Sequence, residues 1–159
     1  VCVDGDDWLS SVFVLEYLNS IYNDKKVWMT YGQYQIYPQG NLGGHYDMNI
    51  HPEIDKRNDY RKYPFPFSHL KTFKYWLFNK IDREDFIDPT TNDIWATSWD
   101  IALCLPMVEM AGLEHIYRCE DILYVLNRSK ELKHMSKMRT EEQKQAEINI
   151  KKRKIYNRL

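Results

Sequence analysis

The chain opens on an apolar triplet, Val1-Cys2-Val3, that runs directly into an acidic turn, Asp4-Gly5-Asp6-Asp7. A strand that is apolar on both faces is typical of the interior of a parallel sheet, because helices cover both faces of such sheets. The opening therefore predicts an α/β fold. It also predicts that the carboxylates stand at the carboxyl end of a strand, where open α/β sheets usually bind their ligands.

The acidic turn places three carboxylates within four positions. Such a cluster needs a compensating positive charge or a shared proton, because like charges repel and each carboxylate is costly to desolvate. Carboxylate oxygens suit Mg²⁺ or Mn²⁺, which typically take one or two protein carboxylates and complete their shell with water and phosphate oxygens. The turn thus indicates a divalent-cation site with a phosphate-bearing ligand. The alternative is an acidic turn in which Asp6 or Asp7 caps the following helix.

Composition excludes several classes of protein. A formal net charge of −1 over 159 residues gives no field that favours nucleic acid or an anionic membrane. The apolar runs are too short to cross a bilayer, and the basic run 151–154 supports weak membrane contact at most. We therefore expect a cytoplasmic protein. Three widely spaced cysteines without CxxC spacing predict buried reduced thiols.

Helices and strands are expected to alternate along the rest of the chain. Apolar residues at helical spacing indicate helices, and β-branched or aromatic runs indicate strands. The elements expected in chain order are a helix over about 8–23, two strands within 26–38 that are separated by a turn or bulge at Gly32, a helix over 68–81 capped by Ser68, a helix over 98–111 stopped by Gly112, one or two strands within 115–127, and a polar, basic helix within 137–159.

The segment 38–67 differs in kind from its neighbours. It has turn-forming residues and no sustained period, and a loop of this length in a small domain usually carries function. Its aromatic side chains are a candidate platform for a sugar, since the C–H faces of pyranoses pack on aromatic rings. The alternative is that they simply anchor the loop. They are Tyr46, Tyr60, Tyr63, Phe65 and Phe67.

The segment VDGDDWL resembles the D-x-D segment of inverting family-two glycosyltransferases, in which an apolar strand leads into D-x-D-D and then Trp or Tyr and Leu. Further blocks occur in the order found in a bacterial and giant-virus branch of that family: WMTYGQY, FSHLKTFKYWLFNKI, WDIALCLPMVEMAG, ILYVLNR and the terminal basic helix. The resemblance implies a partial GT-A fold, a mixed sheet flanked by helices. Residues 1–136 would form its acceptor and metal portion, and the first, nucleotide-binding half would be missing.

Carried over to this sequence, the resemblance implies roles for the acidic turn. Asp4 would face the ribose of the donor or the metal, and Asp6 would bind the metal. Asp7 would orient the turn or bind the metal through a water molecule. The implied metal is Mn²⁺ or Mg²⁺.

The resemblance also implies a catalytic base, Asp100, which follows Trp99 at an expected helix start. Inversion requires one carboxylate to take the proton of the acceptor hydroxyl. The alternative is that Asp100 is an acid in the first turn of a helix, a position that favours negative charge anyway. His134 would meet the metal or the diphosphate, or it is an exposed histidine. His69 would line the acceptor side, or it has a core or capping role.

The implied function is the transfer of a sugar from a nucleotide-diphosphate donor to a hydroxyl of a carbohydrate acceptor. A UDP-sugar is the favoured donor. A second hypothesis is a non-catalytic fragment that serves as a carbohydrate-binding or assembly module. A third, a metal-dependent phosphatase, would need a lysine and a second acidic pair downstream, of which Glu120-Asp121 is a poor version.

Overall fold

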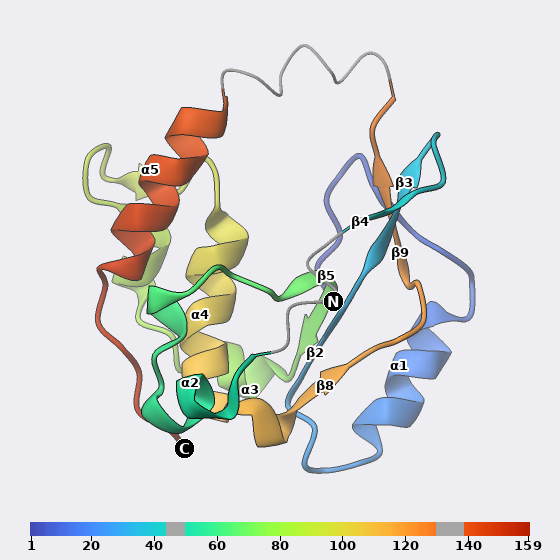
Figure 1. Cartoon of the computed structure of the whole chain (residues 1–159), viewed down its shortest axis with the longest axis horizontal. Helices are drawn as coiled ribbons and strands as arrows, with labels where there is room; N and C mark the ends of the chain where they lie inside the picture. Colours follow the sequence, from blue (N-terminus) through green and yellow to red (C-terminus); the bar gives the residue numbers. More distant parts are fainter. Residues whose placement is uncertain (44–49, 130–138) are drawn as a thin grey trace.

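The chain forms two mixed sheets flanked by helices (Figure 1). The computed structural model describes residues 1–43, 50–129 and 139–159. The helices are α1 (Val14–Tyr22), α2 (Pro52–Arg57), α3 (Tyr75–Phe78), α4 (Trp99–Ala111) and α5 (Arg139–Lys151), with 3₁₀ turns η1 (Tyr60–Lys62), η2 (Arg83–Phe86) and η3 (Leu113–His115). The strands are β1 (Trp8–Leu9), β2 (Met29–Gly32), β3 (Tyr34–Tyr37), β4 (Leu42–Gly43), β5 (Ser68–Phe73), β6 (Ile87–Asp88), β7 (Asp93–Ile94), β8 (Ile116–Arg118) and β9 (Tyr124–Asn127).

One sheet has the order β1-β9-β3-β4 and the other has the order β5-β2-β8, while β6 and β7 form a separate hairpin. The pairs β3–β9 and β2–β8 are parallel, and the remaining pairs are antiparallel. Because Gln33 alone separates β2 from β3, these strands run end to end from one sheet into the other (Figure 1). The predicted α/β class, with a mixed sheet flanked by helices, is therefore confirmed.

The predicted break at Gly32 is present as an irregularity in the pairing of β2 with β5. A Cβ atom on Gly32 would lie 3.2 Å from the carbonyl oxygen of Cys119 and 3.4 Å from that of His69. A side chain at this position would push these segments apart. Glycine therefore lets the chain pass closely between them.

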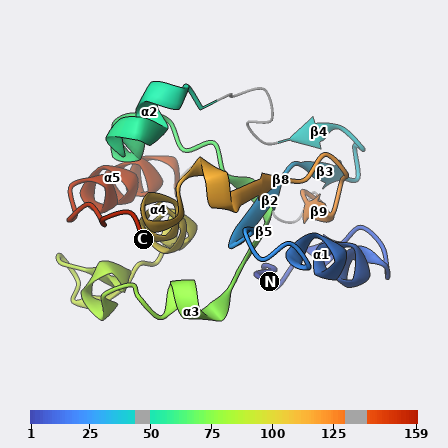
Figure 2. The same ribbon diagram turned by 90° about the horizontal axis from the view of Figure 1, so that it is seen from below.

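Helix α4 is the centre of the core. It is buried from Ile101 to Ala111, and Figure 2 shows it between α5 and the strand β2. A helix that is apolar on every side belongs in the interior. Its predicted end is confirmed, since Gly112 adopts a φ of 67°, which favours glycine. Pro106 lies inside the helix.

A buried ion pair fastens the surrounding elements to α4. Both charged side chains are almost inaccessible, with 5% of Arg61 and 0% of Glu109 exposed. Arg61 donates from Nε to Glu109 Oε1, from Nη2 to Glu109 Oε2 at 2.8 Å, and from Nη1 to the carbonyl of Ile150 at 2.9 Å. The backbone N–H of Tyr156 also donates to Glu109 Oε2, at 3.0 Å. The pair thus joins η1, α4, α5 and the C-terminal segment.

The expectation of a buried central strand at Val1–Val3 is wrong. The triplet forms no strand, and Val1 and Val3 are 57% and 41% exposed. One backbone hydrogen bond, from Cys2 N–H to the carbonyl of Lys71, holds it beside β5. A single bond of this kind does not extend the sheet.

Two predicted helices are also corrected. Residues 68–81 form the strand β5 and the short helix α3, because antiparallel pairing with β2 overrides a local helical pattern. The helix expected over 8–23 begins at Val14, since Trp8 and Leu9 pair with β9 as β1. Neither Asp6 nor Asp7 caps it, and its N-cap position is Phe13.

The C-terminal helix packs on the core through Ala146 and Ile150. It ends at Lys151, and the segment beyond it continues along α4, where Leu159 N–H donates to the carbonyl of Met110 at 3.0 Å. None of the helices within residues 1–43, 50–129 and 139–159 is both long and apolar enough to cross a membrane.

The buried pair predicts a sharp difference between two glutamate substitutions. Glu109→Gln leaves Arg61 charged and buried without its partner, so we expect the free energy of unfolding to fall by about 3–5 kcal/mol. Glu141→Gln removes an exposed partner of Lys144 on α5 and should cost less than about 0.5 kcal/mol. Urea unfolding of both variants measures the difference. Equal, small losses would show that the Arg61–Glu109 pair does not fasten the core.

Candidate functional site

The acidic turn is anchored to β9 through Asp7. Asp7 Oδ2 accepts a hydrogen bond from the hydroxyl of Tyr124 at 2.6 Å, and Oδ1 accepts one from the backbone N–H of Asn127 at 2.7 Å. The Tyr124 hydroxyl also accepts a bond from Asp4 N–H at 3.2 Å. Burial and the bond to Asp7 raise the pKa of Tyr124, so it remains a donor. Asp7 therefore orients the turn.

Asp4 and Asp100 line one cavity of about 230 Å³, together with His69, Ser98 and Gln143. Asp4 comes from the acidic turn and Asp100 from the first turn of α4, so the fold brings together residues almost a hundred positions apart. Burial first, and then the negative charge of Asp7, raise the pKa of Asp4, with smaller contributions from Asp100 and Asp6 and an opposing one from Lys71. The cavity wall is thus rich in negative charge.

Lys71 supplies a positive charge next to this wall. It lies on β5 with 3% of its side chain exposed, and its Nζ donates to Asp100 Oδ2 at 2.9 Å. Burial would lower the pKa of Lys71, but the charges of Asp100, Cys104 and Asp4 outweigh that effect and the pKa is raised. Lys71 therefore stays charged and fixes one oxygen of Asp100, whose side chain is still 32% exposed.

His69 lies two residues before Lys71 on β5 and also faces the cavity. Its ring stacks on Tyr124, with centroids 4.4 Å apart and an interplanar angle of 12°. Its Nδ1 atom is buried and has no hydrogen-bond partner among the described residues. Burial, with the nearby charge of Lys71, lowers the pKa of His69 from 6.5 to about 4. His69 is therefore a neutral imidazole at neutral pH.

A second cavity, of about 390 Å³, adjoins the first, because His69 and Asp100 line both. Lys71, Tyr34 and Glu147 contribute polar groups to its wall. Phe65 and Phe67, from the aromatic segment that follows η1, also line it. Asp100 thus stands between a smaller cavity that Asp4 shares and a larger one that is partly aromatic.

The remaining predicted site residues are not gathered in this way. Asp6 is exposed, and it makes the smallest of the contributions named for the pKa of Asp4. His134 lies outside the described residues. Within the part of the chain that the structure describes, no three His, Cys, Asp or Glu side chains form a group that could hold a metal ion.

Sequence reasoning missed Lys71. Its position within the expected helix 68–81 made it an ordinary surface lysine. Assigning residues 68–73 to a strand would have identified Lys71 as a buried residue. In that strand it lies between Leu70 and Thr72 and next to β2, the central strand of the sheet. A charged residue at such a position needs a buried partner.

No family model, curated protein or solved structure matches this chain.

The buried imidazole predicts a pH dependence of stability. In the unfolded chain His69 takes up a proton as the pH falls below about 6.5, whereas in the folded protein it does so near pH 4. Its contribution to stability is therefore present above pH 6.5 and is lost as the pH falls toward 4, by up to about 3 kcal/mol.

The variant His69→Phe keeps the stacking on Tyr124 and removes this titration. We expect its free energy of unfolding to decline less than that of the original chain between pH 6.5 and pH 4. Urea unfolding across this range, with the imidazole titration followed by NMR, measures the effect. Parallel stability curves, or an imidazole that titrates near its ordinary value, would contradict the assignment.

Proposed function

We propose that this chain carries the acceptor and metal portion of an inverting glycosyltransferase that uses a nucleotide-diphosphate sugar. The observation that carries the proposal is the shared cavity of Asp4 and Asp100, in which Lys71 fixes one oxygen of Asp100. A carboxylate held in this way has its other oxygen available to accept a proton. The larger cavity beside it has room for a hydroxyl-bearing acceptor.

The base in this proposal is Asp100. Its position in the first turn of α4 favours negative charge, since the amino end of a helix carries a partial positive charge. Lys71, held at 2.9 Å, restrains the carboxylate in one orientation. An acceptor hydroxyl within hydrogen-bond reach would lose its proton to Asp100 as it attacks the sugar. His69, as a neutral imidazole, offers a further polar group to a bound hydroxyl.

The fit to a divalent cation rests on Asp4. Burial, and after it the negative charge of Asp7, raises the pKa of Asp4, and a bound cation would favour the charged form of this carboxyl. Mg²⁺ and Mn²⁺ need few protein ligands, so Asp4, with Asp6 nearby in the same turn, is a sufficient donor set when water and diphosphate complete the shell. When bound, the cation would neutralise the diphosphate leaving group.

The decisive experiment is a screen of nucleotide-sugar donors, UDP-sugars first, with Mn²⁺ and hydroxyl acceptors, scored by release of nucleoside diphosphate. We expect Asp100→Asn to lower turnover by about 10²–10⁴-fold, the usual contribution of a general base, while donor binding is retained. Because this change also leaves Lys71 buried without a partner, the double variant Lys71→Met, Asp100→Asn serves as the matched control.

The double variant removes both charges and should restore stability without restoring turnover. The single variant Lys71→Met should keep measurable turnover, since the carboxylate remains. If Asp100→Asn or the double variant turns over at close to the original rate, Asp100 is a structural partner of Lys71 and is not the base.

The metal assignment predicts a separate loss. We expect Asp4→Asn to weaken Mn²⁺ binding in the presence of nucleoside diphosphate by at least about tenfold, because the amide lacks the charge of the carboxylate. Asp82→Asn, which changes an exposed carboxylate elsewhere on the surface, should leave the affinity unchanged. Calorimetry measures both. Equal affinities in the two variants would remove Asp4 from the metal site.

A further inference from the structure

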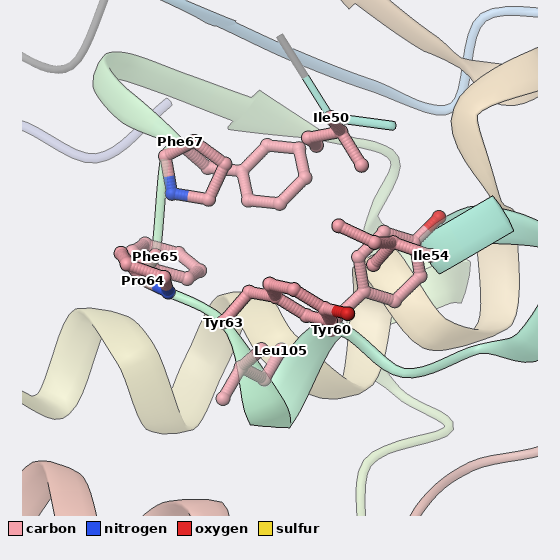
Figure 3. Close-up of a pocket in the computed structure, with 9 residues that line it drawn as sticks. Ile50, Ile54, Tyr60, Tyr63, Pro64, Phe65, Phe67 and Leu105 are labelled. Carbon is pink, nitrogen blue, oxygen red and sulfur yellow. The ribbon is translucent and has the colours of Figure 1, made fainter. Parts of the chain in front are cut away.

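An apolar pocket of about 120 Å³ lies beside the larger cavity, where the segment after η1 crosses α4 and faces α2. Figure 3 shows the side chains of this pocket arranged around a central space. Rings and aliphatic groups form its wall. The main ones are Ile50, Ile54, Tyr60, Phe65, Phe67 and Leu105.

The pocket presents ring faces and few free polar groups. The hydroxyl of Tyr60 donates to Asp55 Oδ1, so it is already used. The rings of Phe65 and Phe67 have centroids 5.4 Å apart at 56°, and those of Tyr60 and Phe67 have centroids 6.3 Å apart at 64°. These tilted arrangements are the ones that aromatic rings prefer. The pocket therefore suits an apolar ligand, in particular another ring.

The wall is held in place from within the protein. Arg61 is bound to the buried Glu109, and Lys151 Nζ donates to the carbonyl of Tyr63 at 2.8 Å. The pairing of β5 with β2 fixes the chain beyond Phe67. A pocket that is formed in advance loses little entropy when a ligand binds.

The volume sets the size of the ligand. An apolar cavity of about 150 Å³ that is lined by Leu, Ile and Phe stays dry and binds benzene. The present pocket, at about 120 Å³, is of the same order. It accommodates a single six-membered ring. A long alkyl chain would need a deeper channel.

The pocket adjoins the proposed acceptor cavity. Pro64, Phe65 and Phe67 line both, and the larger cavity also contains Lys71 and Asp100. A ring bound among the aromatic side chains therefore lies next to the cavity that contains Asp100. The smaller pocket is apolar and suits a ring, whereas the larger cavity has charged side chains that suit a hydroxyl-bearing group.

We propose that this pocket binds a compact aromatic ring of the acceptor, whose hydroxyl-bearing part lies in the adjoining cavity. The role of the bound ring as part of an acceptor rests on the function proposed above, while the affinity of the pocket for an aromatic ring does not. The acceptor class is thus an aryl glycoside or a related ring-bearing alcohol.

The first test is binding of benzyl alcohol to the whole chain, followed by NMR. We expect a dissociation constant on the order of 1 mM, with shifts of the Ile50 and Ile54 methyl signals. Ile54→Phe fills the pocket and should weaken binding at least about tenfold. Ile94→Phe adds the same bulk at an exposed position on β7 and should leave binding within about twofold of the original chain.

A second variant, Phe65→Leu, removes one ring of the wall and should weaken binding even if Ile54→Phe folds poorly. The proposal is overturned if about 10 mM benzyl alcohol shifts no pocket signal, or if it binds both phenylalanine variants equally. It is also overturned if 1-hexanol binds more tightly than benzyl alcohol, because the occupant would then be an alkyl chain.

The second test uses the donor assay with a phenyl glycoside and the matching methyl glycoside as acceptors. We expect a KM at least about tenfold lower for the phenyl compound, from burial of its ring, with a similar kcat. Ile54→Phe should abolish the difference. Turnover without a preference for the phenyl acceptor would overturn the inference and leave the proposed function standing. Benzyl alcohol binding without any turnover would overturn the proposed function and leave the affinity of the pocket for an aromatic ring standing.

Discussion

The fold depends on the buried pair of Arg61 and Glu109. Two charges in the core are costly to desolvate, and they are tolerated because their hydrogen bonds satisfy one another and the backbone of Ile150 and Tyr156. What the pair contributes is a fixed geometry. It fastens α4 to η1, which directly precedes the aromatic segment, and so holds the helix that carries Asp100 beside the rings that line the apolar pocket.

Near the amino end of α4 a second ion pair, Lys71–Asp100, determines the electrostatics of the candidate site. Three carboxylates in a short turn were expected to need a positive partner. In the structure, different groups interact with different carboxylates of the turn. Asp7 is satisfied by hydrogen bonds from Tyr124 and Asn127. Lys71 faces Asp100 and lowers the pKa of Asp4, but burial and the other carboxylates prevail. Asp4 lines the smaller cavity and has a raised pKa, first through burial, which makes it a candidate for binding a cation.

The sequence predicted the elements whose signals are local. Helix α4 was predicted because a long apolar run ends at a glycine, and β2 and β3 because β-branched and aromatic residues flank Gly32. The strand β5 was not predicted, since its residues also fit a helical period and the pairing with β2 that decides the matter is distant in sequence. The same holds for the site. Asp4 and Asp100 were candidate site residues from the sequence. Lys71 is recognised as a site residue only once the pairing of β5 with β2 places it beside Asp100. The Arg61–Glu109 pair had one local signal, the carboxylate of Glu109 within the apolar run that follows Asp100.

The order of the cavities along β5 and the segment before it has a chemical consequence. Going from Phe65 to Lys71, the chain passes from the apolar pocket to the polar cavity and reaches the pair with Asp100 within seven residues. His69 lies between them, neutral because burial and the charge of Lys71 oppose its protonation. A protonated imidazole there would be a second buried positive charge close to Lys71. Burial of His69 therefore keeps a further positive charge out of the wall that the two cavities share with Asp100.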